Sequence, residues 1–252
     1  FGNAGILSAQ AFVPMGMPGI HKKALKMLVD KDGPLTVRWR SLPTTASWLW
    51  RFMRNARPEN MGPISDAMKA LYESTVELHE RLAREAGVPE LVVPGRYLFV
   101  YRNPANADVQ NGLSWKLRRE RGTELEVFDG PALQEIEPEL SPAYKRGVRV
   151  GPLAKTTNPF RLTQAYARLF ESEGGKLLKA AVEAIRPGPR AAVETDAGRQ
   201  EADVLVVAAG AWSKQLAAQI GHKVPLESQR GYHTMLADPS VAPRRNVQWT
   251  ER

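Results

Sequence analysis

Cysteine is absent from the 252-residue sequence, and histidine occurs only four times. Without cysteine the chain has no disulfide framework, no thiolate nucleophile and no cysteine-ligated metal. The histidines show no metal-ligand spacing such as HExxH, which argues against a zinc hydrolase. The sequence also lacks a run of the ~18 apolar residues that a membrane-spanning helix needs. A glycine-rich nucleotide motif of the form GxGxxG is missing as well.

Charged residues make up 25% of the sequence, as in an ordinary globular protein, but basic residues outnumber acidic ones and give a net charge of +8. Such a balance suits anionic lipid or acidic ligands as partners. The basic residues are spread along the chain, and neither an RNA-binding aromatic motif nor a helix-turn-helix pattern is visible. We therefore do not expect a nucleic-acid partner.

The first half of the sequence predicts helices followed by strands. Residues 21–29 and 44–58 have helical patterns, and residues 64–86 carry the clearest apolar stripe, with Ser65 or Asp66 as its cap and Gly87 at its end. A polar helix is expected at about 106–120. Aromatic and β-branched content predicts strands at 96–102, 124–128 and 146–151.

The predicted helix at 44–58 combines Trp48, Leu49, Phe52 and Met53 with three arginines. Aromatic rings and cations together suit a membrane interface. The alternative, which we favour, is that the aromatic side chains pack against the rest of the domain.

The second half alternates helix and strand. A helix begins with Asn158 as its N-cap and ends at Gly174. A strand at 176–185, a hairpin arm, and the apolar strand ADVLVVAAG at 202–210 follow, and a helix closes on Gly221. A continuous apolar strand flanked by helices predicts a parallel sheet covered on both faces.

The end of ADVLVVAAG is the first candidate binding site. Ligands of doubly wound sheets lie beyond the carboxyl ends of the strands, and Ala208, Ala209 and Gly210 leave room for a planar or phosphate-bearing group. The same small residues would also let a helix pack closely on the sheet, so this stretch alone leaves both interpretations open.

The order of these segments resembles the flavoprotein family of glycine and D-amino-acid oxidases and dehydrogenases, above all the D-amino-acid dehydrogenase small subunit. The segments that carry the resemblance, in family order, are FGNAGILSA, VPMGMPGI, DGPLTVRWR, GRYLFVYR, LQEIEPELS, NPFRLTQAYARLFESEGG, VLVVAAGAWS and PLESQRGYHTML. Each motif is loose, but their collinearity over nearly the whole chain is specific.

The resemblance implies an α/β fold, α+β overall, in which a partial Rossmann-like FAD-binding domain accompanies an antiparallel-sheet substrate domain. It assigns 1–20 and 153–225 to the FAD-binding domain, and 21–152, with a helical insertion, and 226–252 to the substrate domain. The residues it places against FAD are Gly2, Asn3, Ala4, Gly5, Val182, Ala208, Ala209, Gly210 and Trp212.

The family's first βαβ unit, with its GxGxxG, is expected before Phe1, and further strands are expected after Arg252. We therefore expect the chain to be a fragment of a longer protein and its own FAD binding to be weakened.

The implied reaction is oxidation of the C–N bond of a D-amino acid by hydride transfer to the flavin, which carries the chemistry while the protein orients the substrate. Alternatives are a sarcosine- or glycine-type amine oxidase and a non-catalytic fragment without cofactor. Arg230, Tyr232 and His233 are the candidate catalytic residues, although the last two point to opposite faces if they lie on a strand. Tyr97 and Tyr101 share a strand face and either bind substrate or are ordinary core aromatics. His21 and His79 are expected to be structural or solvated.

The implied partners are a small amino-acid substrate, a membrane quinone pool as electron acceptor, and a further subunit of a hetero-oligomeric dehydrogenase. The expected location is the cytoplasm, with the inner face of the membrane as the alternative.

Overall fold

The computed structural model describes residues 4–29, 40, 42–228, 231, 234, 237–238, 240–241 and 246–249. Among them, the residues within Phe1–Ser172 and Thr234–Arg252 form one compact unit, and those within Glu173–His233 form a second, smaller one. The smaller unit is therefore inserted into the sequence of the larger.

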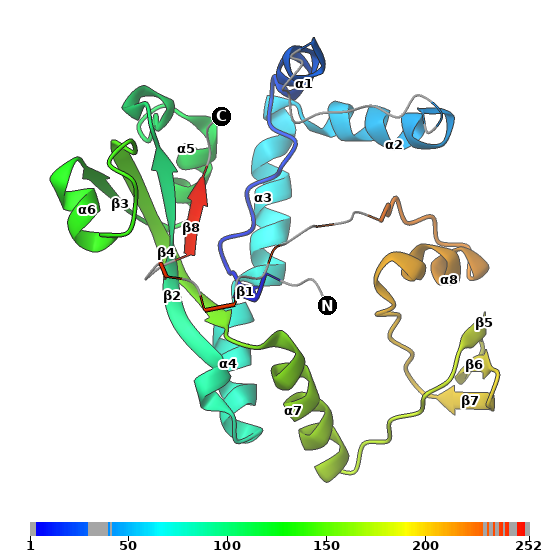
Figure 1. Cartoon of the computed structure of the whole chain (residues 1–252). Helices are drawn as coiled ribbons and strands as arrows, with labels where there is room; N and C mark the ends of the chain where they lie inside the picture. Colours follow the sequence, from blue (N-terminus) through cyan, green and yellow to red (C-terminus); the bar gives the residue numbers. More distant parts are fainter. Residues whose placement is uncertain are drawn as a thin grey trace. The chain divides into compact units, whose positions relative to one another are not determined.

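The larger unit is built on a five-stranded sheet in the order β1-β4-β2-β8, with β3 also paired to β4 (Figure 1). Its strands are β1 (Ile6–Leu7), β2 (Val92–Tyr101), β3 (Glu124–Asp129), β4 (Arg146–Thr156) and β8 (Asn246–Trp249). β4 pairs antiparallel with β1, β2 and β3, whereas β8 runs parallel to β2. The predicted strands at 96–102, 124–128 and 146–151 are confirmed, and all three are longer than expected.

Strand alternation divides the apolar side chains of this sheet between two faces. On one face, α5 (Leu113–Glu120) places Trp115 in a core cluster with Tyr101, Val148 and Val150. On the other, α6 (Pro131–Ile136) places Leu133 against Leu98 and Val100. Each helix thus contributes a large, buried side chain to one face of the sheet.

The predicted single helix at 64–86 is two helices, which are α3 (Pro58–Tyr72) and α4 (Thr75–Glu85). α3 begins with Pro58 at its first position, so the prediction of Ser65 or Asp66 as the cap is wrong. A turn at Glu73 and Ser74 separates the helices, and Ser74 occupies the N-cap position of α4. The sequence predicts one helix because a two-residue turn hardly changes the spacing of the apolar residues on either side of it.

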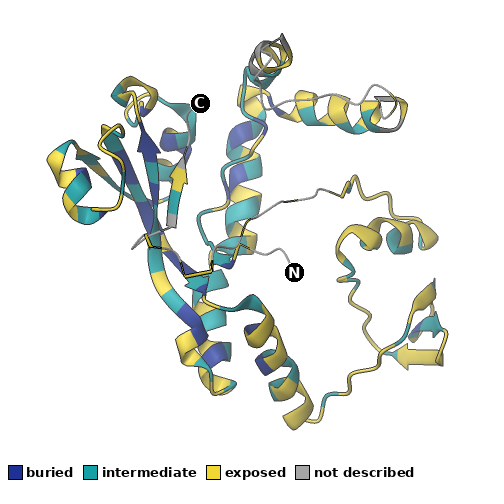
Figure 2. Cartoon of the chain, viewed as in Figure 1, coloured by how far each residue is buried: buried dark blue, intermediate teal, exposed yellow. Residues whose placement is uncertain are grey.

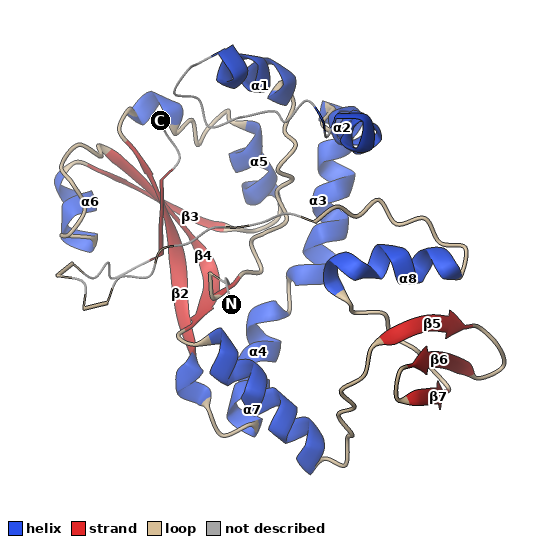
Figure 3. Ribbon diagram, turned by 45° about the vertical axis from the view of Figure 1, so that its right-hand side comes forward, coloured by secondary structure: helices blue, strands red, loops and turns tan. Residues whose placement is uncertain are grey.

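At the lower end of the sheet, α4 lies beside α7 (Pro159–Ser172), as Figures 1 and 3 both show. A third cluster joins Ala83, Leu91, Val92, Ala154 and Leu162, with η2 (Pro89–Leu91) between the helices. The start of α7 is fixed by Asn158, whose Oδ1 accepts a hydrogen bond from the backbone N–H of Arg161 at 3.0 Å. The predicted N-cap is confirmed.

Arg121 ties α5 to α3. Its side chain is 9% exposed, and Nη2 donates to Gly62 O at 2.9 Å and lies 2.8 Å from Asp66 Oδ1. In return, Lys69 Nζ donates to the carbonyl oxygen of Arg121 at 2.9 Å. The ordering of two helices therefore depends on one nearly buried cation.

The N-terminal helices are α1 (Ile20–Val29) and α2 (Leu42–Asn55). In α2 the rings of Trp48 and Phe52 stack with centroids 5.2 Å apart, and Phe52 lies against Gly16. Trp50, by contrast, is 57% exposed. The aromatic residues of α2 are thus divided between an inward and an outward face.

The smaller unit contains a three-stranded antiparallel sheet, β5 (Val182–Arg186), β6 (Ala191–Thr195) and β7 (Gly198–Ala202), followed by η4 (Gly210–Trp212) and α8 (Ser213–Gln219). The predicted hairpin and the helix that ends at Gly221 are confirmed. Gln219 fixes α8 to β5, because its Oε1 accepts from Ile185 N at 2.8 Å and its Nε2 donates to Glu183 O at 3.1 Å. Figure 2 shows that most residues of this unit are exposed.

The prediction that ADVLVVAAG forms a buried parallel strand is wrong. Only Ala202 belongs to a strand, and residues 204–209 have no regular structure. Val204 and Val206 are 77% and 78% exposed. A strand requires a hydrogen-bonded neighbour, and no strand in the described part of the chain pairs with this segment. Residues 176–181 likewise precede β5 as irregular chain.

Candidate functional site

The candidate catalytic residues Arg230, Tyr232 and His233 lie outside the described residues, as do Gly2 and Asn3. Their roles stay predictions.

Ala4 and Gly5 enter β1. Gly5 has φ +68°, and a Cβ at this position would lie 2.7 Å from the carbonyl oxygen of Thr156. The backbone N–H of Thr156 in turn donates to Gly5 O at 2.6 Å. A side chain here would meet both backbone strain and a clash, so the contact with β4 by itself requires the glycine.

The remaining predicted cofactor residues lie in the smaller unit. Val182 opens β5 and is 44% exposed. Ala208, Ala209 and Gly210 continue the irregular segment into η4, where Trp212 is 71% exposed. The main-chain groups of residues 204–208 make no hydrogen bond to other described residues. Their backbone is thus open to an external partner.

Tyr97 and Tyr101 lie on the α5 face of β2, but their surroundings differ. Tyr101 is 7% exposed and belongs to the core cluster around Trp115. Tyr97 is partly buried, pairs across the sheet with Val150, and lines a pocket of about 180 Å³. Burial raises the pKa of the Tyr97 hydroxyl, so at neutral pH it is a hydrogen-bond donor.

The pocket contains a cation that sequence reasoning missed. It lies between the α5 face of the sheet and the segment after β1, and its lining residues are Ser8, Gln10, Ala11, Tyr97, Phe99, Arg118, Val150 and Gln248. Arg118 follows buried Trp115 by three residues, which places both side chains on the sheet-facing side of α5. That spacing was the available signal, but the helix was read only as polar.

The Arg118 guanidinium lies over two aromatic rings. Its Cζ is 5.5 Å from the centroid of Phe99 and 5.1 Å from that of Trp115. The two rings meet edge to face at 5.5 Å. Burial lowers the pKa of Arg118, and the charge of Tyr101 opposes this shift. Even so, an arginine remains cationic at any physiological pH.

His79 belongs to a separate pair between α4 and α7. Its Nδ1 lies 3.0 Å from the hydroxyl oxygen of Tyr166, and this hydroxyl also donates to the His79 carbonyl oxygen at 3.2 Å. Burial lowers the pKa of His79 and raises that of Tyr166. The pair holds two helices together.

Within the described residues, no group of three acidic or histidine side chains is arranged to hold a metal ion. No helix in that part of the chain has both the length and the apolar character needed to cross a bilayer.

The comparison with protein families decides the assignment. The family model of FAD dependent oxidoreductases matches residues 2–252. The chain belongs to this family. The flavoprotein resemblance of the sequence is thereby confirmed.

Curated relatives of this FAD dependent oxidoreductase carry related names. A D-amino-acid oxidase of Bradyrhizobium diazoefficiens is 35% identical over 250 residues, which make up 98% of this chain and 59% of that protein. A D-amino acid dehydrogenase of Agrobacterium fabrum is 30% identical over 238 residues, 92% of this chain and 56% of that protein. The chain thus spans somewhat more than half the length of these relatives.

Glycine oxidase from Geobacillus kaustophilus has the same fold. It matches 86% of this chain and 47% of its own, with a TM-score of 0.53 and 19% identity. Together with the mostly antiparallel sheet of the larger unit, this confirms the mixed α/β fold class expected of the family.

The two FAD-contacting segments expected in this FAD dependent oxidoreductase differ in how well they suit the cofactor. Gly5 is already accounted for by its contact with Thr156. Gly210 shares the positive φ, at +55°, but differs in its surroundings, because no heavy atom of the described chain lies within 4 Å of a Cβ built there. The backbone of residues 204–208 makes no hydrogen bond to other described residues, and the small residues Ala208, Ala209 and Gly210 at its end leave room for a dinucleotide laid against it.

Proposed function

We propose that the chain is part of an enzyme that oxidises the C–N bond of a D-amino acid with FAD. The observation that carries this proposal is the 35% identity, over nearly the whole chain, to a protein named D-amino-acid oxidase. A related D-amino acid dehydrogenase supports the same substrate class.

Bound FAD would supply the acceptor for a hydride from the amine-bearing carbon, and water would hydrolyse the resulting imine. The protein then has to bind the carboxylate and orient the amine. We assign the first task to a cation, Arg230, and the second to Tyr232 and His233. Tyr97 contributes a neutral hydroxyl to a pocket of the larger unit and is proposed to contact substrate together with Tyr101.

The proposed FAD-binding domain comprises 1–20 and 153–225, and the substrate domain 21–152 and 226–252. In the first, Gly2 to Gly5, Val182, Ala208 to Gly210 and Trp212 are assigned to FAD.

Thermal unfolding with and without FAD tests cofactor binding. At FAD about 100-fold above Kd, binding stabilises the chain by roughly 2.7 kcal/mol. Ala208→Leu, which places a larger side chain on the open segment, is expected to abolish the shift. Ala197→Leu, at an exposed alanine of the β6–β7 turn, is the matched control and should preserve it. An unchanged melting temperature with FAD would reject flavin binding by this chain.

The substrate class is tested with the FAD-loaded chain and D-alanine, D-proline and sarcosine, each with oxygen and with an artificial electron acceptor. Oxidation of D-alanine or D-proline, but not of sarcosine, is the expected result. Preference for sarcosine would favour a glycine-type amine oxidase instead, and no turnover of any amine by flavin-loaded protein would leave a non-catalytic fragment.

The electron acceptor is proposed to be a membrane quinone. The outward face of α2 supports this, since exposed Trp50 carries the Arg54 guanidinium 5.1 Å from its ring centroid, and Leu49 and Met53 are also exposed. Such a face suits the boundary between headgroups and acyl chains. Co-sedimentation with vesicles of anionic lipid should be lost in Trp50→Ser. Binding that is unaffected by this change would direct attention to a partner subunit, which is the other proposed electron-transfer partner.

A further inference from the structure

The sheet of the larger unit has an open edge at β3. Among the described residues, β3 pairs with β4 alone. Where their ladder ends, the backbone N–H of Gly130 donates to Lys145 O at 3.1 Å. Because successive residues of a strand direct their backbone groups to opposite sides, those of Leu125, Val127 and Asp129 point away from β4. In the described chain these groups have no other backbone partner, so the edge offers free donors and acceptors.

A pocket of about 450 Å³ opens beside this edge, on the α5 face of the sheet. Its lining residues include Pro104, Ala107, Asp108, Val109, Val127 and Arg146. Val127 is 46% exposed. The opposite wall is the loop before α5, which is held by Arg146 Nη1 donating to Pro104 O at 3.2 Å and by Arg119 Nη2 donating to Gln110 O at 2.7 Å. The pocket is therefore preformed and has room for one large apolar side chain.

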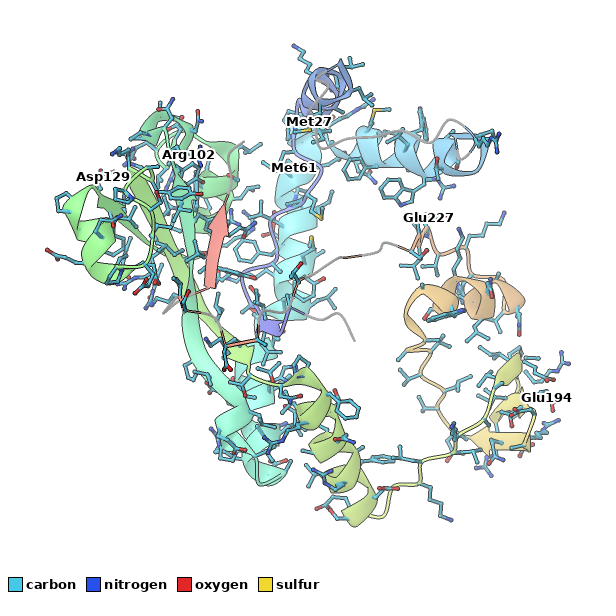
Figure 4. The ribbon with its side chains drawn as sticks, viewed as in Figure 1. Met27, Met61, Arg102, Asp129, Glu194 and Glu227 are labelled. Atoms are coloured by element: carbon cyan, nitrogen blue, oxygen red, sulfur yellow. The ribbon has the colours of Figure 1, made fainter. Side chains whose placement is uncertain are left out.

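The charge that this edge presents to solvent is acidic. In each ion pair between β3 and its neighbours the carboxylate is more exposed than the arginine, and these pairs are Glu124–Arg96, Glu126–Arg149 and Asp129–Arg146. Hydrogen bonds from the arginines lower the pKa of Glu126 and of Asp129 (labelled in Figure 4), so both stay anionic at neutral pH. Asp108 adds an exposed carboxylate at the pocket. An acidic edge thus stands out in a chain whose net charge is +8.

We propose that the β3 edge docks an extended, basic segment of a partner protein as a further antiparallel strand. Strand addition takes its affinity from main-chain hydrogen bonds and its specificity from pockets that accept alternate side chains, and the β3 edge has both. The docked segment places an apolar side chain in the pocket beside Val127 and cationic side chains opposite Asp129 and Glu126.

A second copy of this chain suits the edge less well. Pairing β3 with β3 adds another set of carboxylates to an acidic edge, and like charges across a strand pair are destabilising. The docking edge needs neither FAD nor substrate, so the proposal goes beyond the proposed oxidation.

A fluorescently labelled peptide, Lys-Thr-Phe-Lys-Val-Lys, tests the proposal by fluorescence anisotropy with the full chain. In an antiparallel register centred on Val127, its phenylalanine faces the pocket and its lysines lie opposite Asp129, Glu126 and Glu124. We expect saturable binding below millimolar concentration, weakened by added salt. The peptide Glu-Thr-Phe-Glu-Val-Glu should not bind. Methylating the backbone nitrogen of the phenylalanine removes a main-chain hydrogen bond and should weaken binding at least tenfold, with no change to the protein.

Variants test the same edge from the side of the protein. Val127→Pro removes an N–H that points away from β4, and proline is tolerated at such edge positions. Peptide binding should fall at least tenfold, whereas Val127→Ala keeps the N–H and should weaken it a few-fold at most. Glu124→Gln should also weaken binding a few-fold. Glu77→Gln, the same change at an exposed position of α4, is the matched control and should have no effect. Near-ultraviolet circular dichroism confirms the fold of each variant.

The proposal is overturned if wild-type chain does not bind the lysine peptide, if the glutamate or N-methylated peptide binds equally well, or if folded Val127→Pro binds like wild type. Sedimentation that shows dimers lost in Val127→Pro, without peptide binding, would assign the edge to a second copy instead. Failure of the proposed function looks different. Peptide binding that depends on Val127, with no amine oxidation by the flavin-loaded chain, would leave the docking edge standing and reject the activity.

Discussion

Gly147 of β4 is a position where a single methyl group is expected to disturb the packing of the sheet against α6. It faces α6, and a Cβ built there would lie 2.6 Å from Leu133 Cδ1 and 3.0 Å from Leu98 Cδ1. Both leucines are fully buried. Because α6 covers this face through Leu133, the helix sits close to the strand only if residue 147 has no side chain.

Gly147→Ala therefore overpacks a closed cluster. Overpacking a core typically lowers the free energy of unfolding by about 1–3 kcal/mol. Because the new methyl group would be too close to a methyl group of both leucines, we expect the upper half of that range. Leu133→Ala alone leaves a cavity and should cost about 2–5 kcal/mol. In the double variant the new methyl group occupies part of the space that Leu133 vacates. The double variant should therefore lose less stability than the sum of the losses in the two single variants.

The assay is urea unfolding of the four chains, followed by near-ultraviolet circular dichroism. We expect a coupling energy of about 1 kcal/mol or more between positions 133 and 147. Gly95→Ala is the control, because its Cβ would be 3.8 Å from Leu153 Cδ1, an ordinary contact. A loss of stability in Gly147→Ala no larger than in Gly95→Ala, or strict additivity with Leu133→Ala, would refute the reasoning.

Three further changes test the contacts between helices. Asn158→Ala removes the N-cap of α7 and should cost about 1 kcal/mol in urea unfolding. Arg121→Gln removes the hydrogen bond to Gly62 O of α3 and should cost about 1–3 kcal/mol, whereas Asp66→Asn should cost less than ~1 kcal/mol because Asp66 is 68% exposed. Tyr166→Phe should cost about 0.5–1.5 kcal/mol at neutral pH. His79 makes stability pH-dependent: its pKa is lower in the folded chain, so its contribution is complete above the ordinary histidine pKa of ~6.5 and is lost as the pH falls through the folded value.

Each of these expectations has a matched control. Asn158→Asp keeps an acceptor at the cap and should behave like wild type, so equal losses in the Ala and Asp variants would contradict the capping argument. His79→Gln should flatten the fall in stability below pH ~6.5, and an unchanged pH profile would remove His79 as its cause. An Asp66→Asn variant as unstable as Arg121→Gln would place the stabilisation in the ion pair rather than in the hydrogen bond to Gly62.

The sheet of the larger unit could be predicted in large part from the sequence. Alternating large side chains, as in Tyr97, Phe99 and Tyr101, identify a strand with one buried face irrespective of its neighbours. The helix cap at Asn158 was equally accessible, since it depends on contacts only three residues apart. The family resemblance added the order of the elements and thus the fold class.

Features that depend on distant partners were not accessible. The segment Val204–Ala208 has the composition of a buried strand, but composition does not supply the neighbouring strand to which it must bond. The spacing of Arg118 from Trp115 placed it on the sheet-facing side of α5, but its surroundings could not be predicted. Its significance arises from Phe99 and Gln10, which approach it only once the chain has folded.

The pairing of β8 with β2 has a consequence for biosynthesis. Translation places β2 in the nascent chain long before β8, and at ~5–20 residues per second the interval is on the order of ten seconds. During this interval the edge of β2 that β8 will cover offers unpaired backbone groups over residues such as Leu98 and Val100, a surface prone to pairing with a neighbouring nascent chain. Productive folding on the ribosome thus depends on keeping this edge apart from other copies until β8 has emerged.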